Sequence, residues 1–213
     1  MRDARHNLPV AERTVILIAG FGVATASLRP LARTLRATGA HIEIAPTGLN
    51  VDCGERTVAR LLALVDDQPG RVAIAGHSRG GQLGRVVAVR RPERVDALVT
   101  AGTPWTIGPP ARPGVDAVAL VIRRVTWRGQ PVLGAIDCAH APCCMDFRAD
   151  LERKPVARWT ALWSSRDHIA GDDARPPDAA DAARDIGTTH LGFVLSGTGR
   201  GAIASALDVP RVA

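Results

Sequence analysis

The chain has 213 residues, of which 46% are hydrophobic and 23% are charged, and this fits one globular domain with a sizeable core. No apolar run approaches the roughly 18 residues of a membrane span, and residues 1–13 lack the apolar stretch of a signal peptide, so we expect a cytoplasmic protein. The net charge of +6 comes from scattered arginines, because Lys154 is the only lysine, and aromatic residues are few; nucleic-acid binding is therefore not expected.

Short apolar runs rich in β-branched residues alternate with segments whose apolar residues recur at helical spacing. The runs predict six strands, at residues 14–19, 41–45, 71–75, 95–101, 156–163 and 185–188. The segments predict helices at residues 27–38, 55–67, 82–91, 178–183 and 201–207. This alternation predicts an α/β fold with a mostly parallel sheet of about six strands and helices on both faces. Because we find no internal repeat and no linker, residues 1–213 are predicted to form a single domain.

Residues 105–155 interrupt the alternation, because they hold many prolines, one predicted helix at 115–124 and three of the four cysteines. This segment resembles an insertion more than another strand and helix. Cys138, Cys143 and Cys144 lie close to His140 in sequence, but their spacing matches no common zinc pattern, so no metal site is expected. A disulfide from Cys138 to either of the other two is compatible with the sequence, and thiols are the default in a reducing compartment.

The pattern Gly76-x-Ser78-x-Gly80 lies between the predicted strand 71–75 and the predicted helix 82–91. A strand, a sharp turn and a helix are the context of a nucleophile elbow, which holds its serine in a strained conformation with the hydroxyl exposed. The two glycines are small enough for the strand and the helix to approach closely. The alternative is a glycine-rich turn in which Ser78 only caps the helix, since the bare pattern also arises by chance.

Other candidate residues follow the predicted strands, because functional groups of an open α/β sheet gather at the carboxyl ends of its strands. After the first strand, the turn Gly20-Phe21-Gly22 would aim the Phe21 amide into the site, where it would form an oxyanion hole with the Arg79 amide. A plain glycine turn is the alternative.

Asp167 is the first carboxylate after the predicted strand 156–163, and it would orient a histidine there. Asp172 and Asp173 are rivals further into a polar loop, and a solvated turn residue is the alternative role for Asp167. His190 follows the last predicted strand and is the preferred base, with a capping or packing role as the alternative. The other five histidines are placed less well: His6 in the tail, His41 at the start of a strand, His77 inside the elbow with its ring expected to point elsewhere, His140 in the irregular segment, and His168 beside Asp167.

The order Ser78, Asp167, His190 is the chain order of the α/β-hydrolase triad. Together with this order, several motifs resemble small α/β-hydrolases of the lipase/esterase type: residues 15–22, residues 76–81, Gly102-Thr103-Pro104, Trp163-Ser164-x-x-Asp167-x-Ile169 and His190-Leu191-Gly192. The resemblance implies the α/β-hydrolase fold, with residues 105–155 where family members insert a cap. Two positions depart from it, since Ala19 stands where such lipases often have histidine, and Arg79 stands where an apolar residue is commoner but where chlorophyllases also carry arginine.

The resemblance implies a serine hydrolase that cleaves carboxylic esters, including lipid-like ones, through an acyl-enzyme and without a metal or organic cofactor. Trp105 would line the acyl pocket, although a core role is equally compatible with the sequence. Two other interpretations stay open: a catalytically silent binding protein of the same fold, and an acyltransferase or thioesterase that uses the same triad.

Overall fold

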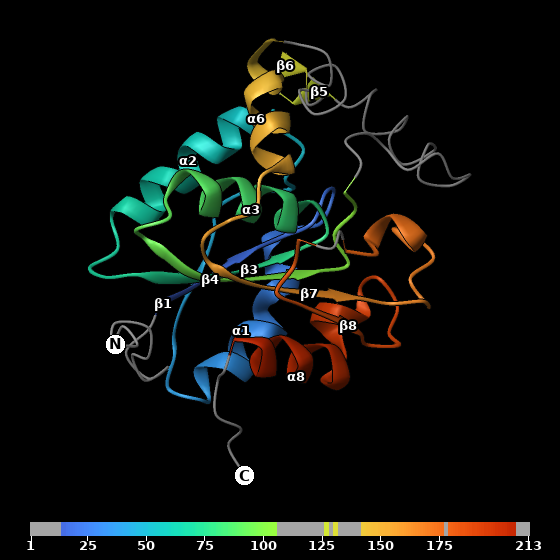
Figure 1. Cartoon of the computed structure of the whole chain (residues 1–213). Helices are drawn as coiled ribbons and strands as arrows, with labels where there is room; N and C mark the ends of the chain where they lie inside the picture. Colours follow the sequence, from blue (N-terminus) through green and yellow to red (C-terminus); the bar gives the residue numbers. More distant parts are fainter. Residues whose placement is uncertain (1–13, 106–125, 128–129, 132–141, 177–178, 208–213) are drawn as a thin grey trace.

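The computed structural model describes residues 14–105, 126–127, 130–131, 142–176 and 179–207 (Figure 1). The predicted helix at 115–124 lies outside these residues, as do Cys138 and His140. None of the helices in the described part of the chain is both long enough and apolar enough to cross a membrane.

A six-stranded sheet forms the centre of the molecule, and every neighbouring pair of its strands is parallel. The strand order is β2-β1-β3-β4-β7-β8, so β3, the strand that leads into the serine motif, lies in the middle of the sheet. The strand bounds are β1 Thr14–Ile18, β2 His41–Ile44, β3 Val72–His77, β4 Val95–Ala101, β7 Arg158–Trp163 and β8 Ala182–Asp185. The predicted mostly parallel sheet of about six strands is confirmed.

Helices cover both faces of this sheet (Figure 1). Side chains alternate along β1, so Val15 and Leu17 face one cluster of buried residues while Ile16 and Ile18 face the other. The first cluster includes residues of α1 and α8, and the second includes residues of α2, α3 and α6. The helices are η3 Thr25–Leu28, α1 Arg29–Arg36, α2 Gly54–Asp66, α3 Arg79–Arg90, α6 Pro142–Glu152, η5 Gly171–Ala174, α7 Gly192–Leu195 and α8 Gly197–Ala206. A separate two-stranded antiparallel pair is formed by β5 Thr126–Trp127 and β6 Gln130–Pro131.

The last strand lies earlier in the sequence than predicted. The predicted helix at 178–183 is wrong, because Ala182 and Ala183 belong to β8 and pair with Thr160 and Ala161 of β7. The predicted strand at 185–188 is wrong for the same reason, since β8 ends at Asp185. Alanine favours a helix by intrinsic propensity, but pairing with the sheet edge overrides a preference of a few tenths of a kcal/mol per residue, roughly.

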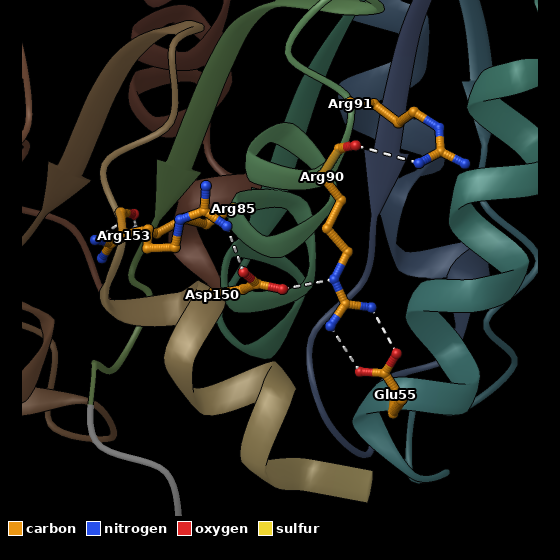
Figure 2. A network of polar contacts seen from close by, with 6 residues as sticks. All are labelled: Glu55, Arg85, Arg90, Arg91, Asp150 and Arg153. Carbon is orange, nitrogen blue, oxygen red and sulfur yellow. Dashed lines mark hydrogen bonds and ion pairs between the residues drawn. The ribbon is translucent and has the colours of Figure 1, made fainter.

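Helix α6 lies inside residues 105–155, where the sequence predicts an insertion and no helix at 142–152. It packs against α2 and α3 over the same face of the sheet, and Figure 2 shows the polar side chains that hold it there. Arg90 of α3 donates to both carboxylate oxygens of Glu55 on α2, at 2.5 and 3.0 Å, and to Asp150 of α6 at 2.7 Å. These three side chains are mostly buried, so their mutual charges are weakly screened.

A second contact holds the end of α6 to α3. The Arg85 guanidinium donates to the carbonyl oxygens of Glu152 and Arg153 and stacks over the Trp159 ring, with its carbon 4.5 Å from the ring centroid. Burial lowers the pKa of Arg85 to about 10, which still leaves the side chain charged at neutral pH. Carbonyl dipoles and an aromatic face therefore stabilise a buried cation at this helix junction.

Arg90→Gln should lower the free energy of unfolding by about 2 kcal/mol, because it leaves the mostly buried carboxylates of Glu55 and Asp150 without their shared cation. Arg91→Gln is the matched control, since Arg91 pairs with the exposed Asp66 and its loss should leave the stability nearly unchanged. Urea unfolding of both variants measures the difference. Equal losses would show that Arg90 contributes no more than a surface ion pair.

Candidate active site

Ser78 occupies a one-residue turn between a strand and a helix. Strand β3 ends at His77, helix α3 begins at Arg79, and Ser78 between them has φ 54° and ψ −126°. A positive φ is strained for a residue with a Cβ, and such strain is common where a side chain is held for chemistry. The strand–turn–helix expected around the Gly76-x-Ser78-x-Gly80 pattern is present.

The glycines of the motif are needed because the backbones of β1, β3 and α3 are in direct contact there. A Cβ on Gly76 would lie 2.3 Å from the carbonyl oxygen of Gly80, and a Cβ on Gly80 would lie 2.3 Å from that of Ile18. Strands β1 and β3 and helix α3 therefore approach so closely that no side chain fits between them. This contact fixes the direction in which Ser78 leaves the sheet.

Asp167 and His190 form a hydrogen-bonded pair beyond the ends of β7 and β8. His190 Nδ1 lies 2.7 Å from Asp167 Oδ2, and both residues are buried, with 7% and 2% of their surface exposed. The other oxygen, Oδ1, accepts hydrogen bonds from the backbone amides of Ile169 and Ala170 at 2.9 and 3.0 Å. Because the carboxylate accepts from Nδ1–H, the lone pair of a neutral His190 is left on Nε2.

Burial by itself raises the pKa of Asp167, but the hydrogen bond and the charge of His190 together with the two amides lower it below the ordinary value. Asp167 is therefore an anion at neutral pH although it is buried. Its rivals lie elsewhere: both belong to the 3-10 helix η5, with Asp172 exposed and Asp173 half-buried. The structure thus brings Asp167 and His190 together and leaves Asp172 out.

His77 has a role that the sequence did not predict. Its ring, expected to point elsewhere, lies against the His190 ring with 4.8 Å between the centroids. Its Nε2 lies 2.9 Å from the His190 carbonyl oxygen, and since a carbonyl only accepts, Nε2 carries the proton. Burial, followed by the charge of His190, lowers the pKa of His77 to about 4, so the ring is neutral near pH 7. His77 thus connects the strand end that carries Ser78 to the segment that carries His190.

The turn after β1 lies directly against Ser78. A Cβ on Gly20 would lie 3.1 Å from the Ser78 Cβ, so the backbone that leads into Phe21 passes beside the serine. Gly22 has φ 69°, which glycine adopts freely, and its amide donates to the Leu49 carbonyl at 2.8 Å. Phe21 lies between these glycines, and Arg79 is the first residue of α3, so both predicted amide donors belong to backbone next to Ser78.

Strand β4 completes the same rim of the sheet. Gly102 follows β4 with φ 57°, and a Cβ there would lie 2.8 Å from the Phe193 ring and 3.1 Å from Asp167 Oδ2. Trp105 lies further on, half-buried, with its ring edge-on to Trp159 at 5.3 Å between centroids. Its packing on the core agrees with the core role that the sequence left open, and its predicted part in substrate binding stays a prediction.

Across the described ranges, no group of three or more histidine, cysteine, aspartate or glutamate side chains is arranged to hold a metal ion.

No family model and no curated protein matches the sequence, but solved structures match the fold. A lipase from Bacillus licheniformis, BlEst2 in its mature form, has a TM-score of 0.66 at 14% identity over 96% of this chain and 95% of its own. A monoacylglycerol lipase from Paleococcus ferrophilus has a TM-score of 0.64 at 15% identity over 93% and 95%. Polyneuridine aldehyde esterase has a TM-score of 0.60 at 14% identity over 92% and 98%.

These neighbours are α/β-hydrolases, and the chain has the α/β-hydrolase fold, as the motifs predict. At sequence identities this low, the structural similarity establishes the fold alone, and the activity depends on the residues of the site.

The stability should depend on pH through His77. The folded protein binds a proton on His77 only near pH 4, whereas the unfolded chain binds it near pH 6.5, so the free energy of unfolding falls as the pH decreases between these values. The expected contribution of this one group is about 3 kcal/mol. In His77→Gln the side-chain amide donates to the same carbonyl oxygen but does not titrate. Urea unfolding at several pH values should therefore show a free energy of unfolding that falls less with decreasing pH than it does in the wild type. A variant whose free energy of unfolding depends on pH as strongly as that of the wild type would contradict the buried, neutral state of His77.

Proposed function

We propose that the protein is a serine hydrolase that cleaves carboxylic esters, with Ser78 as nucleophile, His190 as base and Asp167 as the residue that orients His190. The observation that carries the proposal is the buried hydrogen bond from His190 Nδ1 to Asp167, 2.7 Å long, at the same rim of the sheet as a serine with φ 54°. A buried acid–histidine pair beside a strained serine is the arrangement that acyl transfer needs.

In the first step, Ser78 Oγ attacks the ester carbonyl and its proton passes to His190 Nε2. The negative charge on the substrate oxygen is stabilised by the amides of Phe21 and Arg79, which form the proposed oxyanion hole. When the tetrahedral intermediate collapses, the bond to the alcohol breaks and His190 gives the proton to the departing alcohol. Water then attacks the acyl-enzyme, losing a proton to His190, and the carboxylic acid leaves as Ser78 regains its proton.

Asp167 supports each of these steps without binding substrate. As an anion it stabilises the charged His190 that forms when Ser78 loses its proton, and its hydrogen bond keeps Nε2 as the basic nitrogen. The two backbone amides on Oδ1 hold the carboxylate in place, so the orientation of His190 does not depend on a mobile side chain.

Apolar side chains next to the site favour an apolar acyl group. Ile169, Leu191 and Leu49 are about half exposed, at 42%, 42% and 50%, although they are large and hydrophobic. The first two follow Asp167 and His190 closely in sequence, and the backbone of Leu49 bonds the turn after β1. Small-molecule or lipid-like esters are therefore the substrates we infer, in line with the lipases and the esterase among the structural neighbours.

Ser78→Ala should lower kcat at least about a thousandfold on p-nitrophenyl esters, because it removes the proposed nucleophile. Asp167→Asn should lower it about 10²–10⁴-fold, since His190 then loses the hydrogen bond that fixes its tautomer. Ser165→Ala, which changes an exposed serine, is the control and should keep the wild-type rate. A panel of esters of increasing acyl length, with thioesters and added alcohols, separates esterase from thioesterase and acyltransferase activity.

Labelling by a fluorophosphonate probe separates an enzyme from a binding protein of the same fold. The wild type should be labelled once, at Ser78, and Ser78→Ala should not be labelled. Wild-type protein that ignores the probe, or esterase activity that survives Ser78→Ala unaltered, would rule out the mechanism.

A further inference from the structure

The side chain of Arg79 binds the loop between β2 and α2. Its Nη1 donates to the side-chain oxygen of Asn50 at 2.9 Å and also to the Asn50 carbonyl oxygen, and its Nη2 donates to the Asp52 carbonyl oxygen at 2.6 Å. All three acceptors are uncharged and belong to the loop between β2 and α2. A planar guanidinium can reach them together, whereas an ammonium on one carbon stem cannot.

The same loop holds the peptide units on both sides of the Phe21 amide. On one side, Asn50 Nδ2 donates to the Ala19 carbonyl oxygen at 2.7 Å. On the other side, the Leu49 carbonyl oxygen accepts from the Gly22 amide at 2.8 Å. The peptide unit between them carries the Phe21 N–H, so its orientation is fixed by its two hydrogen-bonded neighbours.

Asn50 is suited to join these two sets of bonds. Its φ is 50°, a conformation that asparagine tolerates better than most residues, and it is 1% exposed. Its amide accepts from Arg79 through the oxygen and donates to Ala19 through the nitrogen, so one buried side chain is bonded at both ends. The chain of contacts runs from Arg79 through Asn50 to Ala19.

We propose that the Arg79 side chain and Asn50 are positioning residues, which together set the distance between the Phe21 and Arg79 amides of the oxyanion hole. The inference rests on the proposed function, and it assigns a role to the arginine that distinguishes this elbow from elbows with an apolar residue. Because the amide and the guanidinium belong to the same residue, the loop that holds Phe21 is tied directly to the other donor.

The expected effect is on the transition state and not on substrate binding. A donor that is lost from such a site costs about 10²–10³ in kcat, and a misplacement of about 1 Å costs about 10². Arg79→Ala and Asn50→Gly should therefore lower kcat about 10–100-fold with KM within about twofold. Asn50→Gly keeps the backbone conformation accessible, so it removes the side-chain bonds without adding strain at a positive φ.

Two readouts separate positioning from a general loss of structure. Affinity for an alkyl boronic acid, which forms a tetrahedral anion on Ser78, should fall in both variants as far as kcat falls, while both variants, although less stable, keep one cooperative unfolding transition above the assay temperature. Millimolar guanidinium should restore part of the activity of Arg79→Ala, and Arg79→Lys should remain impaired because it cannot bond Asn50 and Asp52 together. The double variant should be little worse than either single one, since both act through one turn.

Arg56→Ala is the matched control, because Arg56 also pairs with this loop, through the Asp52 side chain at 3.4 Å, but from the exposed side. It should keep the wild-type kcat and boronate affinity. The inference alone is overturned if Arg79→Ala and Asn50→Gly react with the fluorophosphonate probe as fast as the wild type. If the wild type itself does not react, the proposed function fails and this inference fails with it.

Discussion

The close approach of β1, β3 and α3 is the constraint on which the rest of the site depends. Backbone meets backbone at Gly76 and Gly80, where a single Cβ would lie 2.3 Å from a carbonyl oxygen. With strand and helix this close, only one residue is left for the turn, and Ser78 takes a strained φ of 54°. The turn after β1 then passes beside the serine, because β1 is the strand next to β3. The positions of the Ser78 hydroxyl and of the backbone amides beside it thus follow from this one packing contact.

Hydrogen bonds also join the segments that follow neighbouring strands at this edge of the sheet. Asp167 binds His190, His77 binds the carbonyl of His190, and Asn50 binds the carbonyl of Ala19. Each bond joins segments far apart in the sequence, and each satisfies a buried polar group that would otherwise cost stability. The Asp167 carboxylate is the charged partner of His190, and the Arg79 guanidinium donates to the Asn50 side chain and to the carbonyl oxygens of Asn50 and Asp52. The Asp167 carboxylate therefore favours positive charge on His190.

Much of the fold follows from local sequence patterns, and the errors have physical causes. Apolar runs such as Thr14–Ile18 predict the parallel sheet correctly, because buried strands need apolar side chains. The alanine-rich sequence of β8 predicts a helix instead, because its pairing with β7 is not visible in the local sequence. The proposed triad residues could be chosen because each follows a strand or lies in a glycine motif. His77 and Asn50 could not, because their partners His190 and Ala19 lie 113 and 31 positions away. Local patterns place a residue on a strand end, but packing decides what it touches.

The central claim is that Ser78, His190 and the amides of Phe21 and Arg79 converge on one reacting group. A crystal structure of the protein after reaction with an alkyl phosphonate tests it most directly. We expect phosphorus bonded to Ser78 Oγ, its free oxygen within hydrogen-bond distance of both amides, and His190 Nε2 facing the Ser78 oxygen while Nδ1 keeps its bond to Asp167. An adduct on another residue, or a phosphoryl oxygen turned away from both amides, would contradict the claim.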